Sequence, residues 1–288
     1  MNILVTGSNG QLGNELQRLA PEFPGFKFLF TDVGELDITD EMAVDSMISE
    51  KNPEAIINCA AYTAVDKAEK EEELAYRINA KAPGNLAKAA ARHNLFLIHI
   101  STDYVFGGTG YRPYAEDDKK DPVSVYAKSK LAGEAEVLTH AKTALILRTS
   151  WLYSEFGHNF VKTIIKYGKE RGALKVVYDQ IGSPTYAHDL AQAIITILQN
   201  CAKPKGVNVY HYANEGVASW YDFAEAILEI TGIPCKLTPI ETHEYPLPAA
   251  RPFYSVLKKE KIKQAFNLEI PYWRESLAVC LNRLGPYH

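Results

Sequence analysis

The feature that most constrains the fold is a set of three glycines, spaced three apart, directly after an apolar segment at the start of the chain. Residues 2–6 are predicted to form a β-strand, and Gly7, Gly10 and Gly13 follow it, with a helix expected from Gln11. Such glycines permit a tight turn, a close approach of main chain to pyrophosphate and close helix–strand packing. The helix N-terminus then offers free N–H groups to an anion. This pattern predicts a dinucleotide-binding turn; the competing interpretation is a plain strand–helix turn.

The first half of the chain alternates apolar segments with helical ones. The predicted strands are Asn2–Thr6, Lys27–Thr31, Ala55–Asn58, Phe96–Ser101 and Ala144–Arg148. The predicted helices are Gln11–Ala20, Glu41–Lys51, Leu74–His93 and Ser124–Thr139. Continuous apolar strands suit a parallel sheet that is covered on both faces. The alternation therefore predicts an α/β fold with a Rossmann-like, doubly wound parallel sheet.

The second half is less regular and carries a cluster of prolines in its last third. The predicted helices are Asn159–Arg171, Asp189–Gln199, Trp220–Ile230 and Trp273–Leu284, with strands at Lys175–Tyr178 and Asn208–Tyr212. We expect residues 1–150 to form a dinucleotide-binding domain, which a segment at roughly 174–200 rejoins. Residues 151–288 are expected to form mainly a smaller C-terminal α/β lobe for the substrate.

Asp32 ends the second predicted strand, 19 residues beyond Gly13. A carboxylate at this place accepts hydrogen bonds from the adenosine ribose and repels a 2′-phosphate. The glycine turn contains no Arg or Lys to offset that repulsion, and no GK[ST] sequence follows to indicate a P-loop. Taken alone, Asp32 favours NADH over NADPH; the alternative is that Asp32 only begins a turn.

Tyr126 and Lys130 are four residues apart in a predicted helix, so their side chains share one face. An ammonium beside a phenol lowers the pKa of the phenol, and the pair can deliver a proton to a forming alkoxide. Tyr254 and Lys258 have the same spacing, so spacing alone does not identify a site. Only Tyr126 follows a buried strand that ends in hydroxyl and carboxylate side chains.

That strand ends in Ser101-Thr102-Asp103. Doubly wound sheets bind ligands at the carboxyl ends of their strands, where a hydroxyl of Thr102 or Ser101 can stabilise charge on a reacting carbonyl. A strand-end cap is the simpler interpretation of either hydroxyl alone. Together with the glycine turn, Tyr126 and Lys130, the catalytic interpretation is favoured.

Composition narrows the function classes. The 288 residues carry a net charge of −4, which argues against a nucleic-acid partner. No segment approaches the roughly 20 apolar residues of a membrane span, and no histidine or cysteine spacing indicates a metal site. The dispersed cysteines are typical of thiols in a reducing compartment, so we expect a cytoplasmic protein; they are Cys59, Cys201, Cys235 and Cys280.

With a GxxGxxG turn, a Ser/Thr strand end and a YxxxK pair, the chain resembles the extended short-chain dehydrogenase/reductases. Within them it is similar, nearly end to end, to the dTDP-4-dehydrorhamnose reductase family. The segments that carry this similarity are Asn58–Glu69, Ser101–Phe106, Arg148–Tyr153, Asp179–Thr185 and Ala250–Pro252. Tyr104 stands where related dehydratases usually have an acidic residue, which favours reduction over dehydration. The chain departs from the family at Tyr62, commonly His, and at Cys59, commonly Ala.

The resemblance implies reduction of the C4 ketone of dTDP-4-dehydro-β-L-rhamnose to dTDP-β-L-rhamnose, for cell-surface polysaccharide, with NADPH or NADH. Tyr126 would donate the proton, Lys130 would hold the nicotinamide ribose, and Thr102 would polarise the ketone. The coenzyme would also contact Gly7, Gly10, Gln11, Leu12, Gly13, Asp32, Asp37, Ile38, Ala61, Tyr62 and Thr63. The dTDP-sugar would be held by Thr102, Asp103, Trp151 and Arg251, the last at the diphosphate.

Two other functions compete with this interpretation. One is another nucleotide-sugar enzyme on the same scaffold, such as an epimerase or a reductase of a different 4-keto sugar. The other is a non-catalytic regulatory subunit that keeps the dinucleotide site, against which the intact set of Thr102, Tyr126 and Lys130 argues. The sequence leaves the oligomeric state open, a homodimer included.

Overall fold

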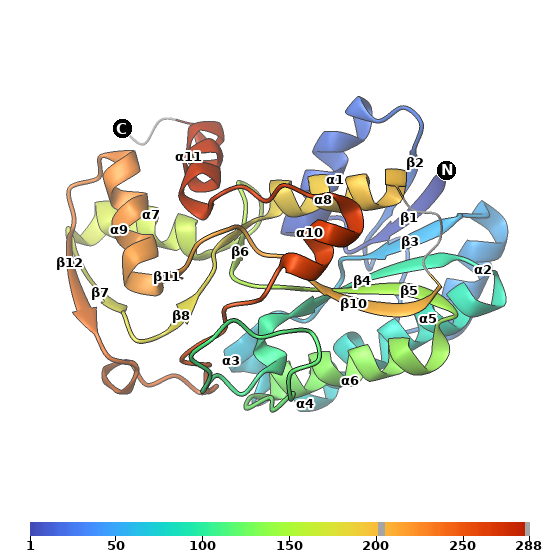
Figure 1. Cartoon of the computed structure of the whole chain (residues 1–288), viewed down its shortest axis with the longest axis horizontal. Coiled ribbons are helices and arrows are strands. Elements are labelled where there is room, and N and C mark those ends of the chain that lie inside the picture. Colours follow the sequence, from blue (N-terminus) through green and yellow to red (C-terminus); the bar gives the residue numbers. More distant parts are fainter. Residues whose placement is uncertain (201–204, 286–288) are drawn as a thin grey trace.

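The computed structural model describes residues 1–200 and 205–285 of the chain. Its centre is a six-stranded parallel sheet in the order β10-β5-β4-β3-β1-β2 (Figure 1). The strands are β1 (Asn2–Thr6), β2 (Lys27–Thr31), β3 (Ala55–Asn58), β4 (Phe96–Thr102), β5 (Thr143–Thr149) and β10 (Gly206–His211). The chain order reverses between β1 and β3, and that switch point is where sheets of this kind bind nucleotides.

Helices cover both faces of the sheet, which confirms the doubly wound architecture. Alternate residues of β1 point to opposite faces, so Ile3 and Val5 enter one core cluster while Leu4 enters the other. The first cluster contains residues of α1 (Gln11–Leu19), α8 (Ala187–Asn200) and α10 (Glu260–Phe266). The second contains residues of α2 (Glu41–Lys51), α5 (Ala82–Arg92) and α6 (Val125–His140).

A second lobe has its own apolar core, built mainly from α7 (Phe160–Arg171), α9 (Trp220–Thr231) and α11 (Trp273–Leu284) (Figure 1). A parallel pair of strands, β7 (Ala173–Val177) and β12 (Lys236–Ile240), lies against α7 and α9. The remaining pairs are β6 (Leu152–Tyr153) with β9 (Thr185–Tyr186) and β8 (Ile181–Gly182) with β11 (Ala218–Ser219).

The expected helical stretch Leu74–His93 is helical from residue 72 to residue 92, but it is not a regular α-helix throughout. The chain forms α4 (Glu72–Tyr76), a π-helical turn η2 (Arg77–Lys81) and then α5 without interruption. Pro83 explains the change in helix type, because it lacks the N–H that would bond the carbonyl of Asn79 in a regular α-helix. The short helix α3 (Val65–Ala68) and the 3₁₀ turns η1 (Ala20–Glu22), η3 (Asp103–Val105) and η4 (Thr242–Glu244) were also not predicted.

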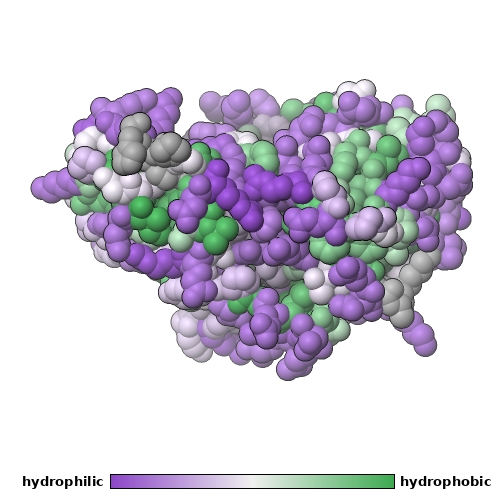
Figure 2. Space-filling model, turned by 90° about the horizontal axis from the view of Figure 1, so that it is seen from above, coloured by the Kyte–Doolittle hydropathy of each residue, from purple (hydrophilic) through white to green (hydrophobic). Residues whose placement is uncertain are grey.

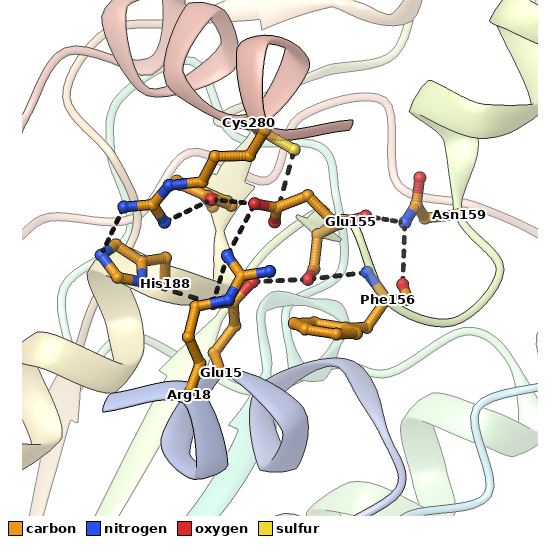
Figure 3. A network of polar contacts seen from close by, with 10 residues as sticks. Glu15, Arg18, Glu155, Phe156, Asn159, His188 and Cys280 are labelled. Carbon is orange, nitrogen blue, oxygen red and sulfur yellow. Dashed lines mark hydrogen bonds and ion pairs between the residues drawn. The ribbon is translucent and has the colours of Figure 1, made fainter. Parts of the chain in front are cut away.

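A network of polar contacts joins α1 to the second lobe (Figure 3). Arg18 pairs with Glu155 at 2.7 Å, and the buried carboxylate of Glu15 accepts a 2.7 Å hydrogen bond from Ser154. At the start of the same helix, Gln11 accepts a hydrogen bond from Asn159 at 2.9 Å. The helix that follows the glycine turn is therefore fixed to the second lobe along its length.

The outer surface is largely hydrophilic on the face seen in Figure 2, with separate apolar patches. Within residues 1–200 and 205–285, no helix is long and apolar enough to cross a membrane. The thiols of Cys59, Cys235 and Cys280 are free; Cys201 lies outside the described residues.

Candidate active site

The glycine turn folds so closely that two of its positions exclude a side chain. Gly7 has a φ of 68°, and a Cβ there would lie 2.5 Å from the main-chain nitrogen of Ala60. A Cβ at Gly13 would lie 2.5 Å from the Cα of Ser8. Helix α1 begins after Gly10 without a side-chain cap, so its first N–H groups remain available to an anion.

A cavity of about 450 Å³ opens in front of this turn. It brings together six of the predicted coenzyme residues, which are Gly7, Gly10, Asp32, Asp37, Ile38 and Ala61. Gly13 and Leu12 lie behind the turn, Leu12 within the core. The phenol of Tyr62 donates to Glu71 at 2.5 Å, and Thr63 is exposed. The space around the glycines fits the pyrophosphate of a dinucleotide. The acidic wall of the cavity, formed by Asp32 and Asp37, fits the ribose.

The acidic wall of the cavity has one cation beside it. The carboxylate of Asp32 accepts main-chain N–H groups of Asn9 at 2.9 Å and Val33 at 2.8 Å. The pKa of Asp37 is lowered, first by the N–H of Thr39 and also by the charge of Arg77. Arg77 lines the same cavity and was not predicted, because its position within a helical segment carries no motif.

The predicted catalytic residues come together at the carboxyl end of β4. Ser124 caps α6 by accepting the N–H of Ala127, which places Tyr126 in the first turn of that helix. Burial raises the pKa of Tyr126 to about 12, and the nearby Thr102 hydroxyl opposes that rise. Thr102 and Tyr126 are therefore neighbours, as the sequence predicted.

Lys130 lies behind them with only 2% of its surface exposed, and its Nζ donates to the carbonyl of Ile100 at 2.6 Å. Burial lowers the pKa of Lys130 to about 8. The expectation that Lys130 lowers the pKa of Tyr126 is wrong for this structure, because burial raises that pKa and the side chains that act on it are Thr102 and Asp103. Tyr126 is consequently held as a neutral phenol that can give up a proton.

Asp103 and Tyr104 follow Thr102 at the carboxyl end of β4. Thr102 donates to Asp103 at 3.0 Å, and burial raises the pKa of the Asp103 carboxyl to about 7. The ring of Tyr104 meets that of Tyr126 edge-on, with centroids 5.9 Å apart. Asp103 thus contacts Thr102, the predicted catalytic threonine, directly.

Trp151 lies at the junction of the lobes and stacks on Trp220 with ring centroids 3.5 Å apart. Its φ of 46° is unusual for a residue other than glycine, and such strain is often found at functional sites. Gly182 allows the contact, because a Cβ there would lie 2.5 Å from the indole.

Arg251 lines a second cavity of about 880 Å³ between α7, β7 and the 242–251 segment. Its guanidinium makes two hydrogen bonds to the carboxylate of Asp66, at 3.0 and 2.6 Å. Asp66 was not singled out from the sequence, because its partner is 185 residues away. The structure therefore pairs Arg251 with a carboxylate of α3 at the edge of this cavity.

Among the described residues, no group of three potential metal ligands is found. The glycine cradle at the switch point and the neighbouring Thr102, Tyr126 and Lys130 define a nicotinamide-dependent oxidoreductase of the extended short-chain dehydrogenase/reductase type.

Comparison with known proteins gives the particular family. The model of the RmlD substrate binding domain matches residues 1–285. The dTDP-4-dehydrorhamnose reductase of Aggregatibacter actinomycetemcomitans is 43% identical over 284 residues, with 96% of each chain covered. The chain belongs to the dTDP-4-dehydrorhamnose reductase family.

Two solved structures agree with this assignment. A reductase of the same name from Clostridium acetobutylicum has a TM-score of 0.92 and 44% identity, with 99% of each chain covered. The Bacillus anthracis reductase, solved in complex with NADP, has a TM-score of 0.93 and 41% identity, covering 98% of this chain and 99% of that one.

Proposed function

We propose that the protein reduces the C4 ketone of dTDP-4-dehydro-β-L-rhamnose to dTDP-β-L-rhamnose, using NADPH or NADH. The observation that carries the proposal is the convergence of Thr102 and Tyr126 at the end of β4, with Lys130 behind them. The relatives named for this reaction match the chain over nearly its whole length and supply the identity of the sugar.

The proposed chemistry adds a hydride to C4 and a proton to the ketone oxygen, which leaves an alcohol. The reduced nicotinamide supplies the hydride when it is bound. The Thr102 hydroxyl donates a hydrogen bond to the oxygen and so stabilises the charge that develops there. The Tyr126 phenol transfers its proton to the same oxygen, and Lys130 supplies positive charge beside the phenolate that remains.

Binding roles complete the proposal. The glycine turn and α1 hold the pyrophosphate, and Asp32, Asp37 and Ile38 line the adenosine end. Asp103 and Trp151 hold the sugar, and Arg251 faces the nucleotide diphosphate from the larger cavity. Residues 1–150, with a returning segment at roughly 174–200, serve mainly the coenzyme, and the rest of residues 151–288 serve mainly the substrate. We place the protein in the cytoplasm, since its cysteines are those of a reducing compartment.

The test is oxidation of NADPH and of NADH, followed by absorbance, with enzymatically generated dTDP-4-dehydro-L-rhamnose and product identification by mass spectrometry and NMR. Formation of dTDP-L-rhamnose is expected, and the two rates give the coenzyme preference. Folded, coenzyme-bound protein that oxidises neither coenzyme would refute the proposal. Parallel assays with UDP- and GDP-keto sugars would then separate a sister enzyme from a regulatory subunit.

A further inference from the structure

Behind the catalytic helix lies a buried ion pair that the roles above do not use. Glu134 of α6 and Arg148 of β5 are each 2% exposed. Arg148 donates to both oxygens of the Glu134 carboxylate, at 2.8 and 2.7 Å. The hydroxyl of Ser101 adds a third hydrogen bond to that carboxylate at 2.6 Å. The position of the carboxylate is therefore fixed by three hydrogen bonds from two residues.

The Glu134 carboxylate is connected to Lys130 through α6 and to Thr102 through β4. Glu134 follows Lys130 by one helical turn, so the two side chains share a face of α6. Ser101 adjoins Thr102 on β4, and Arg148 is the register partner of Ser101 on β5. Ser101 and Arg148 of this strand pair thus hold the Glu134 carboxylate on the face of α6 that also carries Lys130.

Lys130 itself has few polar neighbours. Its Nζ donates to the carbonyl of Ile100, and within the described residues no carboxylate lies in ion-pair distance of it. The charged group that acts on the Lys130 pKa is Glu134 from its own helix, and Lys130 in turn acts on His99 of β4. Both burial and Lys130 lower the pKa of His99, so His99 is neutral and supplies no positive charge. Glu134 is the group that opposes the loss of the proton from Lys130.

A buried ion pair is a weak source of stability, because desolvation offsets much of its attraction. Arg148 also donates to the main-chain carbonyl of Glu116 at 3.1 Å, so it would have a partial partner without Glu134. Stability alone does not account for a carboxylate at this position beside a buried amine.

We propose that Glu134 is a positioning residue for the reduction: its fixed carboxylate keeps Lys130 in the ammonium form beside Tyr126. The catalytic meaning of this inference rests on the proposed function. The effect of Glu134 on the protonation of Lys130 does not depend on the proposed function, because it can be measured on Lys130 itself.

Two readouts test the inference. In protein labelled with carbon-13 at lysine Cε, the Lys130 signal is assigned with Lys130→Arg and its pKa is measured by NMR titration. Removal of an opposite charge at short range shifts a pKa by about one unit or more. In Glu134→Gln the Lys130 pKa should therefore fall by about one unit, and the alkaline limb of the kcat–pH profile should move to lower pH by the same amount. An unchanged Lys130 pKa would overturn the inference.

A second variant separates this role from packing. Glu134→Gln leaves Arg148 buried without its carboxylate, whereas Glu134→Gln with Arg148→Met removes both charges. The double variant should recover the Tm of the parent and still lower the Lys130 pKa, by a smaller amount. Recovery of the parental pKa and pH profile would show a purely structural role.

The matched control is Glu215→Gln, which removes a carboxylate paired with Lys259 and Lys263 in another part of the molecule. It should leave the titration of Lys130 unchanged. If the parent protein does not reduce the ketone, the proposed function fails, and the NMR titration still decides the role of Glu134.

Discussion

Replacing Gly133 with alanine tests how closely the catalytic helix must pack. Gly133 lies on α6, three residues after Lys130, and faces the π-helical turn η2. A Cβ at this position would lie 2.0 Å from the carbonyl oxygen of Asn79. That oxygen belongs to the main chain and cannot rotate away, so α6 and η2 would have to separate.

The magnitude follows from the contact distance. Close carbon–oxygen contacts are about 3.3 Å or longer, so relief of a 2.0 Å contact needs roughly 1.3 Å of movement. Overpacking of this kind costs about 3 kcal/mol, and alanine in place of glycine returns about 1 kcal/mol of helix propensity. The net loss is about 2 kcal/mol, which lowers the Tm by about 4 °C in a chain of this size.

The same movement displaces Tyr126 and Lys130, which α6 carries. Misplacement of catalytic groups by about 1 Å costs roughly 10²-fold in rate. Calorimetry and coenzyme oxidation measure the two effects. The control is Gly84→Ala, whose one short contact would be with Oε2 of Glu136 at 2.7 Å, at the end of a side chain that can rotate away. Gly84→Ala should keep the parental kcat and a Tm at or slightly above that of the parent, because alanine favours the helix; equal behaviour of Gly133→Ala would refute the packing argument.

Two further predictions concern Tyr126 and Asp103. Tyr126→Phe should keep coenzyme affinity and lose roughly 10²–10⁴-fold in kcat, as measured by coenzyme oxidation, because it lacks the acidic proton; near-parental turnover would rule out Tyr126 as the acid. Burial raises the pKa of Asp103 to about 7, above its value of about 3.9 in the unfolded chain. The protonated Asp103 carboxyl therefore contributes fully to the free energy of unfolding below about pH 4, and this contribution is lost as the pH rises through about 7. The Tm of Asp103→Asn should therefore rise relative to the parent between about pH 4 and about pH 8; a constant difference would contradict the raised pKa.

The sheet was predictable because its inner strands are buried on both faces and rich in apolar residues. The ends of β1 to β5 were predicted to within one residue, whereas the edge strand β10 begins two residues before its predicted start. Strand β12 was not predicted, because Pro239 interrupts it and most of its residues are exposed. The two-residue strands of the second lobe are too short to have a periodic pattern.

The residues of the candidate site were also predictable only in part. The sequence could single out Thr102, Tyr126 and Lys130 as candidates because the strand end and the helix spacing are local features. The partner of Arg251 was not, since the Asp66 contact depends on how the two lobes meet. The pKa of Tyr126 also depends on tertiary burial, which four-residue spacing cannot reveal.

The position of β10 limits how members of this family can exchange parts. Residues 206–211 pair with β5 at the edge of the central sheet, although the chain has by then already built β6, α7 and β7. A cut after residue 150 would leave β5 paired with β4 alone and would expose its other, apolar edge, which invites aggregation. A single crossover between two parental genes near residue 150 would therefore combine the edge strand of one parent with the sheet of the other. Viable chimeras of these enzymes need at least two junctions, so that β5, α8 and β10 are inherited together.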